Sequence, residues 1–118
     1  MADPALIAEA ARKAGVLWVA APRRAPVPAW QVWRDGATYL LTGPGEQALP
    51  GLAQAAECEV TARSAETGGR LVTWPAAVTR VEPGSDEWRQ IVPALAAARL
   101  NGHPDWTTAT VLKLTPVV

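Results

Sequence analysis

The dipeptide Asp35-Gly36 is the feature that most constrains how this chain can fold. It stands between two strand-like runs, Trp30 to Arg34 and Ala37 to Thr42. Asp-Gly is a pair that favours the tight turn of a β-hairpin. We therefore expect the two runs to be antiparallel neighbours, because strands joined by so short a turn cannot be parallel.

The remaining strands are indicated by short apolar runs and by alternation. They are expected at Val16 to Ala21, Glu57 to Ser64, Leu71 to Val81 and Thr108 to Pro116. The second of these alternates cleanly, which places Cys58, Val60 and Ala62 on one buried face. Pro22 to Pro28 is interpreted as a loop, because its prolines each withhold a donor from a sheet.

Two or three helices are expected: two follow a capping residue, and a short one is expected between the strand that ends at Thr42 and the strand that begins at Glu57. Asp3-Pro4 supplies an N-cap and a first-turn proline before an amphipathic run that Gly15 ends. Ser85 and the two acids after it begin a second helix. The 118 residues suffice for one core, so we expect a single mainly β domain with peripheral helices. Its six short antiparallel strands would form a small barrel or a half-open sheet.

Charge and composition argue against several classes of function. Eleven basic and eleven acidic side chains cancel, whereas a nucleic-acid-binding surface normally shows a basic excess. No apolar run approaches the roughly 20 residues that span a bilayer, so we expect no membrane partner. The N-terminal sequence lacks the pattern of a signal peptide, and a single cysteine, Cys58, suits a reducing cytoplasm. We therefore expect a cytoplasmic protein.

The glycine-rich stretch after the hairpin resembles a nucleotide-binding motif. Gly43, Gly45 and Ala48 spell G-x-G-x-x-A. A dinucleotide fingerprint needs a parallel strand before it and a full helix after it. Here the preceding strand is the second arm of a hairpin, and Pro50-Gly51 interrupts whatever follows. We interpret the motif as a coincidence of turn residues.

Six tryptophans are unusual in so short a chain. Trp18, Trp74 and Trp88 lie on apolar faces and are predicted to be core residues. Trp30 and Trp33 would point to opposite faces of one strand, so one of them is expected to face an interface or a flat aromatic ligand. Trp106, in a loop beside His103 and Asp105, is the other candidate for exposure.

The polar residues that could carry chemistry give weak signals. His103 is the only histidine, and Cys58 has no spacing that suggests a metal site or a catalytic dyad with it. We therefore predict no metal site. Arg63 and Arg70 flank a turn and could reach one anion from adjacent strands, although ordinary surface charge explains them as well.

Three phrases together resemble a known family. They are PAWQVWRDGATYLLTGPGEQ, VTARSAETGGRLVTWPAAVTRVEPGSDEW and LAAARLN. The chain from Val16 to Pro116 resembles the pyridoxamine 5′-phosphate oxidase-like proteins, the flavin-binding split barrels, and particularly their short actinobacterial members. The resemblance implies a six-stranded split barrel over residues 16–116 after an N-terminal helix at 1–15, within one domain of 1–118. It also implies a homodimer with two flavin sites at its interface.

The same resemblance implies where a cofactor would lie. The strand around Trp30 would run along the flavin ring, the segment from Leu41 to Ala48 would wrap the phosphate, and Thr61 to Ser64 would complete the pocket. Trp106 would reach the pocket of the partner subunit. The implied cofactor-binding residues are Trp30, Gln31, Val32, Thr42, Gly43, Gln47, Arg63, Ser64, Arg70 and Trp106.

The sequence departs from the family in the phosphate-binding segment. Cofactor-binding members carry a basic pair there, and this chain has Gln47 and Ala48 instead. Two hypotheses follow: an FMN-dependent or deazaflavin-dependent oxidoreductase of unknown substrate, or a non-catalytic dimer whose altered pocket holds another ligand. Nucleic-acid binding by a small barrel is a third, which the neutral charge disfavours.

Overall fold

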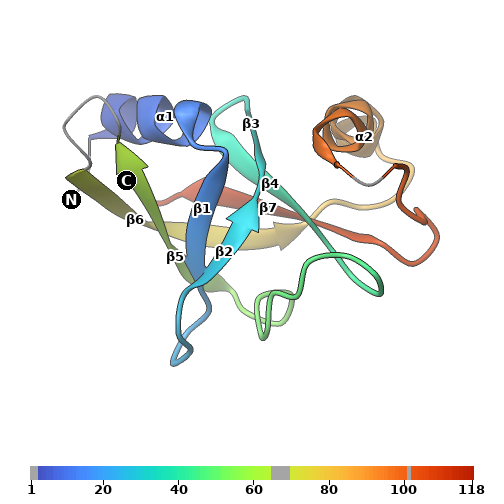
Figure 1. Cartoon of the computed structure of the whole chain (residues 1–118), viewed down its shortest axis with the longest axis horizontal. Helices are drawn as coiled ribbons and strands as arrows, with labels where there is room; N and C mark the ends of the chain where they lie inside the picture. Colours follow the sequence, from blue (N-terminus) through green and yellow to red (C-terminus); the bar gives the residue numbers. More distant parts are fainter. Residues whose placement is uncertain (1–2, 65–69, 101) are drawn as a thin grey trace.

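The computed structural model describes residues 3–64, 70–100 and 102–118, with only the backbone described at residues 64 and 70. Over that part of the chain it has two helices and seven strands. The elements are α1 (Pro4–Lys13), β1 (Val16–Ala20), β2 (Val27–Trp30), β3 (Val32–Arg34), β4 (Ala37–Thr42), β5 (Glu57–Ser64), β6 (Arg70–Arg80), α2 (Asp86–Ala98) and β7 (Thr110–Pro116). The strands form one antiparallel sheet in the order β2-β1-β5-β6-β7-β4-β3 (Figure 1).

The sheet curls into a nearly closed barrel because its two ends are consecutive in the chain. β2 pairs with β1 and β3 pairs with β4, and Gln31 alone separates β2 from β3. The predicted antiparallel split barrel is therefore confirmed, with seven strands in place of six. The prediction that Trp30 to Arg34 forms one strand of the hairpin is wrong in its first half, because Trp30 pairs with Val16.

The Asp35-Gly36 turn, from which the hairpin was predicted, has the expected geometry. Asp35 and Gly36 both have positive φ, 51° and 79°, and β3 and β4 pair on either side of them. The loop predicted over 22–28 is shorter than expected, because Val27 and Pro28 belong to β2. A proline is tolerated there because β2 stands at one end of the strand order, where a ladder bond can be missing.

The barrel interior is one apolar cluster that α1 closes at one end. Its buried side chains come from all parts of the sheet, and Ile7, Ala10 and Ala11 of α1 join them. Trp74 is the bulkiest of these side chains, at 1% exposed. The alternation predicted for β5 is confirmed, since Cys58, Val60 and Ala62 are buried.

A second cluster lies on the outside of the barrel, where α2 covers β3 and β4. Ile91 and Leu95 of α2 are buried against Tyr39 and Leu41 of β4. Figure 1 shows α1 and α2 over separate parts of the barrel. Because α2 covers this outer face, both faces of β4 are apolar.

Polar contacts fasten α2 to the same face. Glu87 accepts a hydrogen bond from the hydroxyl of Tyr39 at 2.8 Å and one from the Lys113 ammonium at 2.7 Å. Both donors stabilise the carboxylate and hold the pKa of Glu87 below its ordinary value. The same pairing raises the pKa of Lys113, and burial raises the pKa of Tyr39.

The tryptophans follow the prediction only in part. Trp74 is core as expected and Trp88 is half-buried, but Trp18 is 48% exposed, so its assignment to the core was wrong. The apolar sequence of β1 is typical of a strand that is buried on both faces, whereas in the structure of this chain only its inner face is covered. Trp30 and Trp33 do face different clusters, Trp30 the one under α2 and Trp33 the interior.

Candidate functional site

A groove of about 420 Å³ opens where the end of β2 meets the glycine loop and the C-terminal end of α2. We call it the loop groove. Its lining residues are Gly15, Val16, Trp30, Gly45, Glu46, Gln47, Ala98, Arg99 and Leu100. The volume lies within the usual range for small-ligand sites.

The aromatic wall of the loop groove is held in place by a side chain of the loop. Gln47 Oε1 accepts from the backbone nitrogen of Trp30 at 3.1 Å, and Gln47 Nε2 donates to the Trp30 carbonyl at 3.1 Å. Thr42 Oγ1 in turn donates to the Gln47 carbonyl at 2.8 Å. The side chain of Gln47 thus replaces a neighbouring strand at the end of β2, and holds the Trp30 backbone in place.

The glycines of the loop serve its shape. Gly43 has a φ of 122°, and a Cβ there would lie 2.9 Å from the Thr108 carbonyl oxygen, so a larger residue would not fit. Gly45 also has a positive φ, 79°. The strand before them is antiparallel, and residues 43–56 contain no helix, so the short helix expected before Glu57 is not present. The interpretation of G-x-G-x-x-A as turn residues is confirmed, because a dinucleotide fingerprint needs a parallel strand and a helix.

A buried ion pair joins the loop to α2. Arg99 Nε donates to Glu46 Oε1 and Arg99 Nη2 donates to Glu46 Oε2, both at 2.9 Å. Arg99 Nη1 also donates to the Gly102 carbonyl at 2.8 Å. The side chains are 16% exposed for Arg99 and 6% for Glu46. A bidentate pair this well buried is a strong and geometrically specific contact.

Of the residues implied by the resemblance, Trp30 and Gln47 line the loop groove, and Thr42 and Gly43 shape its loop. Gln31 points elsewhere, because its Nε2 donates to the carbonyls of Ala11 and Ala14 at the end of α1, at 2.8 and 3.0 Å.

Two further residues implied by the resemblance pack under or beside α2. Val32 is partly buried in the cluster beneath the helix. Trp106 stands edge to face against Trp88, with ring centroids 5.7 Å apart. Trp106 is half-buried and not fully exposed, and neither it nor Val32 is among the residues that line the loop groove.

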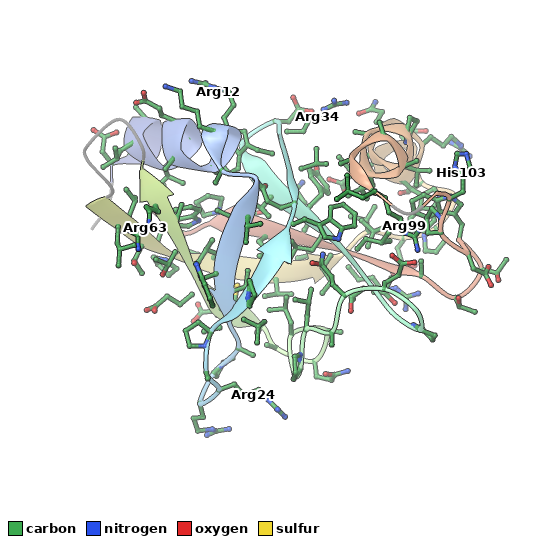
Figure 2. The ribbon with its side chains drawn as sticks, in the orientation of Figure 1. Arg12, Arg24, Arg34, Arg63, Arg99 and His103 are labelled. Carbon is green, nitrogen blue, oxygen red and sulfur yellow. The ribbon has the colours of Figure 1, made fainter. Side chains whose placement is uncertain are left out.

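Arg63, one of the basic residues predicted near the phosphate, lies away from the loop groove. Figure 2 shows Arg63 on β5 and Arg99 beside α2, on opposite sides of the barrel. Arg63 is exposed on the outer face of the sheet, and its neighbour Ser64 pairs with Arg70 in the hairpin ladder. The side chains of Ser64 and Arg70 lie outside the described residues. Within one chain, then, the described part of the predicted set divides among four places: the loop groove with its loop, the end of α1, the cluster at α2, and the outer face of β5.

Sequence reasoning missed Glu46 and Arg99. They stand 53 positions apart, and no local pattern links them. The available signal was the position of Arg99, a lone charged residue that follows an apolar helix end at Leu95 to Ala98. A cation there must find a partner or face solvent, and the structure gives it a carboxylate of the loop.

The thiol and the imidazole do not form a catalytic pair. Cys58 is buried in the interior cluster, and burial raises its pKa to about 12. His103 is exposed in the loop after α2. A nucleophilic cysteine needs a lowered pKa, so Cys58 is a core residue. Among residues 3–64, 70–100 and 102–118, no group of three or more histidines, cysteines and acids is placed to hold a metal ion.

A second cavity lies beneath the β1–β2 loop. It measures about 270 Å³ and is lined by Val19, Arg24, Ala25, Val27, Leu49, Pro50 and Leu52. Arg24 is its one polar side chain, and Arg24 covers Gly51 so closely that a Cβ on Gly51 would lie 2.5 Å from Arg24 Nε. The loop groove is the better candidate, because Trp30 and three polar residues line it, whereas Arg24 is the one polar residue that lines the second cavity.

Comparisons with known proteins support the fold. No protein-family model and no curated protein matches the sequence. Three solved structures of similar fold are a candidate pyridoxamine 5′-phosphate oxidase from Listeria innocua, an F420 reductase, and HutZ, the haem storage protein of Vibrio cholerae. Their TM-scores are 0.70, 0.62 and 0.59, at 12%, 11% and 16% identity. The alignments cover 98%, 92% and 97% of this chain and 94%, 91% and 89% of the other chains.

At these identities the likeness concerns the fold. The chain has the split-barrel fold of pyridoxamine 5′-phosphate oxidase-like proteins, as the sequence resemblance predicted. None of the helices in the described part of the chain has the length and apolar character needed to cross a membrane.

Proposed function

We propose that the loop groove binds the ring system of a flavin, FMN or a deazaflavin, and that the chain is a small oxidoreductase whose substrate is unknown. The observation that carries the proposal is the Trp30 wall, which Gln47 holds at both its backbone nitrogen and its carbonyl. A flat indole fixed beside a groove of about 420 Å³ suits a flat aromatic ligand.

The chain's residues would bind and orient the ring. A bound flavin supplies the hydride or electron chemistry, so the protein needs no catalytic acid of its own. Trp30 would pack against the ring, while the glycine loop and the end of α2 would bound it on either side. In this proposal the protein works in the reducing cytoplasm, which suits a single cysteine, Cys58, that is buried and unpaired.

The similar structures offer two classes of cofactor, and the groove favours one. An F420 reductase acts with a deazaflavin, whereas a haem storage protein holds haem. Haem iron is usually held by a histidine, cysteine, methionine or tyrosine. The residues that line the loop groove include none of these, and the Glu46 carboxylate is already paired with Arg99. The lining therefore suits an organic ring better than a metalloporphyrin.

A homodimer is part of the proposal, and the outer face of the sheet supports it. Val16, Trp18 and Leu71 are 52%, 48% and 58% exposed, and we call them the apolar patch. Trp18 pairs with Thr61 and Thr61 with Thr73, while Leu71 pairs with Arg63, so β1, β5 and β6 present these side chains on one face. Val16 belongs both to the apolar patch and to the loop groove. A second copy that covers the patch would therefore lie beside the groove.

A non-catalytic binding module is the second candidate function. The Glu46–Arg99 pair favours it, because the pair neutralises a cation that could otherwise bind an anionic cofactor. The two candidates differ in one measurable property. A redox protein keeps its bound flavin reducible by an external electron donor, whereas a binding module holds a ring that takes no part in turnover.

The first experiment is a visible absorption spectrum of the purified protein, before and after incubation with excess FMN and gel filtration. Deazaflavin F420 and haem are the parallel ligands. A retained flavin or deazaflavin band supports the proposal, and retention of haem alone would contradict it. Trp30→Ala should release the ring, whereas Trp30→Phe should keep most of the binding because it preserves a flat wall. Equal retention by both variants would remove Trp30 from the site.

A further inference from the structure

The ion pair at the edge of the loop groove bears on the kind of flavin that the groove accepts. Glu46 and Arg99 are joined by two parallel hydrogen bonds, and both side chains are largely buried. They are the charged residues among those that line the groove. The two charges cancel, so the lining offers a bound ligand no net charge.

All three nitrogen atoms of the Arg99 guanidinium donate a hydrogen bond to a protein acceptor. Nε and Nη2 point to Glu46, and Nη1 points to the Gly102 carbonyl. A phosphate could take the two parallel bonds of Nε and Nη2 only by displacing the Glu46 carboxylate, and it would then lie beside that carboxylate. Two anions held close together in a partly buried site repel each other strongly.

The C-terminal end of α2 also disfavours an anionic group in the loop groove. Arg99 is the C-cap of α2, and its backbone nitrogen donates to the Leu95 carbonyl. The C-terminal end of a helix carries a partial negative charge from its last carbonyls, which disfavours an anion nearby. If the flavin ring packs against Trp30, the chain attached to the ring would lie between this helix end and the loop at Gly45 and Glu46.

We infer that Glu46 occupies the position an anionic group would take on Arg99, so the loop groove selects a flavin with an uncharged tail over its phosphate ester. This inference rests on the proposed function, since it assumes that a flavin ring lies against Trp30. The chemistry expected of the ligand is that of riboflavin: an aromatic ring with a neutral, hydroxyl-bearing chain. The hydroxyls of such a chain can bond the loop without disturbing the ion pair.

The test compares riboflavin with FMN, which differ by the phosphate alone. Dissociation constants of both are measured by quenching of flavin fluorescence on the full chain, and their ratio is the readout. We expect riboflavin to bind about tenfold more tightly than FMN, since one repulsive charge contact in such a site is worth about that much. Equal affinities, or tighter binding of FMN, would overturn the inference.

Variants of the pair give a second readout. Glu46→Gln keeps an acceptor for Arg99 but leaves the guanidinium charge uncompensated, so the ratio should shift about tenfold toward FMN. Glu46→Gln combined with Arg99→Gln removes both the repelling carboxylate and the attracting guanidinium, so its ratio should lie between those of the unmodified chain and of Glu46→Gln. Glu57→Gln is the matched control, because Glu57 is exposed at the start of β5, outside the groove lining. A shift in Glu46→Gln no larger than in this control would overturn the inference.

The outcomes separate this inference from the proposed function. If the unmodified chain binds none of riboflavin, FMN and deazaflavin F420, the proposed function fails and the inference fails with it. If the chain binds riboflavin and FMN with equal affinity, the ring site stands and only the selection by charge is wrong. The ratio in the unmodified chain is informative even if a variant does not fold.

Discussion

The side chain of Gln47 brackets the backbone of Trp30, with its oxygen on the Trp30 nitrogen and its nitrogen on the Trp30 carbonyl, each at 3.1 Å. The contact lies at the end of β2, the strand that pairs with β1. The chain then continues into β3, which pairs with β4. A strand end without a neighbour would leave its N–H and C=O groups unpaired. Gln47 therefore supports both the corner of the barrel and the wall of the loop groove.

Replacing Gln47 with alanine should cost stability and binding together. Two neutral hydrogen bonds to a half-buried backbone are worth about 1–2 kcal/mol in all. The free energy of unfolding, measured by urea denaturation, should fall by that amount, and retention of a flavin should weaken because Trp30 loses its support. Gln54→Ala is the control at an exposed glutamine. Unfolding and flavin retention that match the unmodified chain would show that Gln47 supports neither.

Much of the fold was predictable because its signals are local. Asp35-Gly36 predicts its hairpin because both residues readily adopt the positive φ that the turn needs. The strand β5 was predicted from its strict alternation, which buries Cys58 and Val60. The division at Gln31 was not predictable. Nothing local shows that Trp30 pairs with β1 while Val32 pairs with β4, since both pairings depend on how the sheet closes.

Only part of the groove lining could be named from the sequence. Trp30 and Gln47 were identified through a resemblance, and they do line one groove. Glu46 and Arg99 were missed, because their contact joins a loop to a helix end 53 residues later. The bonds of Gln31 to the end of α1 were also missed, because they depend on where that helix packs, and its contact with a cofactor stays a prediction. Long-range polar contacts of this kind leave no periodic trace in a sequence.

The contacts of Glu87 predict a pH dependence of stability. Donation from Lys113 and from Tyr39 lowers the pKa of Glu87 from its ordinary value of 4.5. A carboxyl group whose pKa is lower in the folded state stabilises the fold above its unfolded pKa, and this contribution is lost as the pH falls. Glu87→Gln should therefore cost about 1 kcal/mol at pH 7, a value limited by the partial exposure of the ion pair.

The difference in free energy of unfolding between the unmodified chain and Glu87→Gln should shrink as the pH falls below about 4.5, because Glu87 then becomes protonated in the unmodified chain. Urea denaturation from pH 3 to pH 8 measures it. Asp86→Asn is the control, because Asp86 pairs with Arg89 in a highly exposed contact. A constant difference across this range would mean that the charge of Glu87 contributes nothing to stability.

The thiol of Cys58 should be inert in the folded protein. Burial raises its pKa to about 12, so at pH 8 only about one thiol in ten thousand is ionised, and the thiolate is the reactive form. A disulfide reagent such as Ellman's reagent should react slowly in native buffer and with one equivalent in concentrated urea. Rapid stoichiometric reaction of the native protein would contradict the burial of Cys58 in the interior cluster.

Trp18 provides the test of the dimer. Its side chain is a 48% exposed member of the apolar patch, on a strand whose sequence looks buried on both faces. Exposed apolar side chains gathered on one face commonly mark a protein interface. Trp18→Glu should convert a dimer into a monomer, as measured by gel filtration with light scattering, because a carboxylate cannot be buried there without a partner.

Val118→Glu is the matched control, since Val118 is exposed but lies beside α1 and not in the patch. It should leave the mass unchanged. A monomeric Trp18→Glu protein should also lose flavin more readily than the dimer does, because Val16 belongs both to the patch and to the groove. If the unmodified chain is itself monomeric at tens of micromolar, the patch is not an interface between copies, and the groove must hold its ligand within one chain.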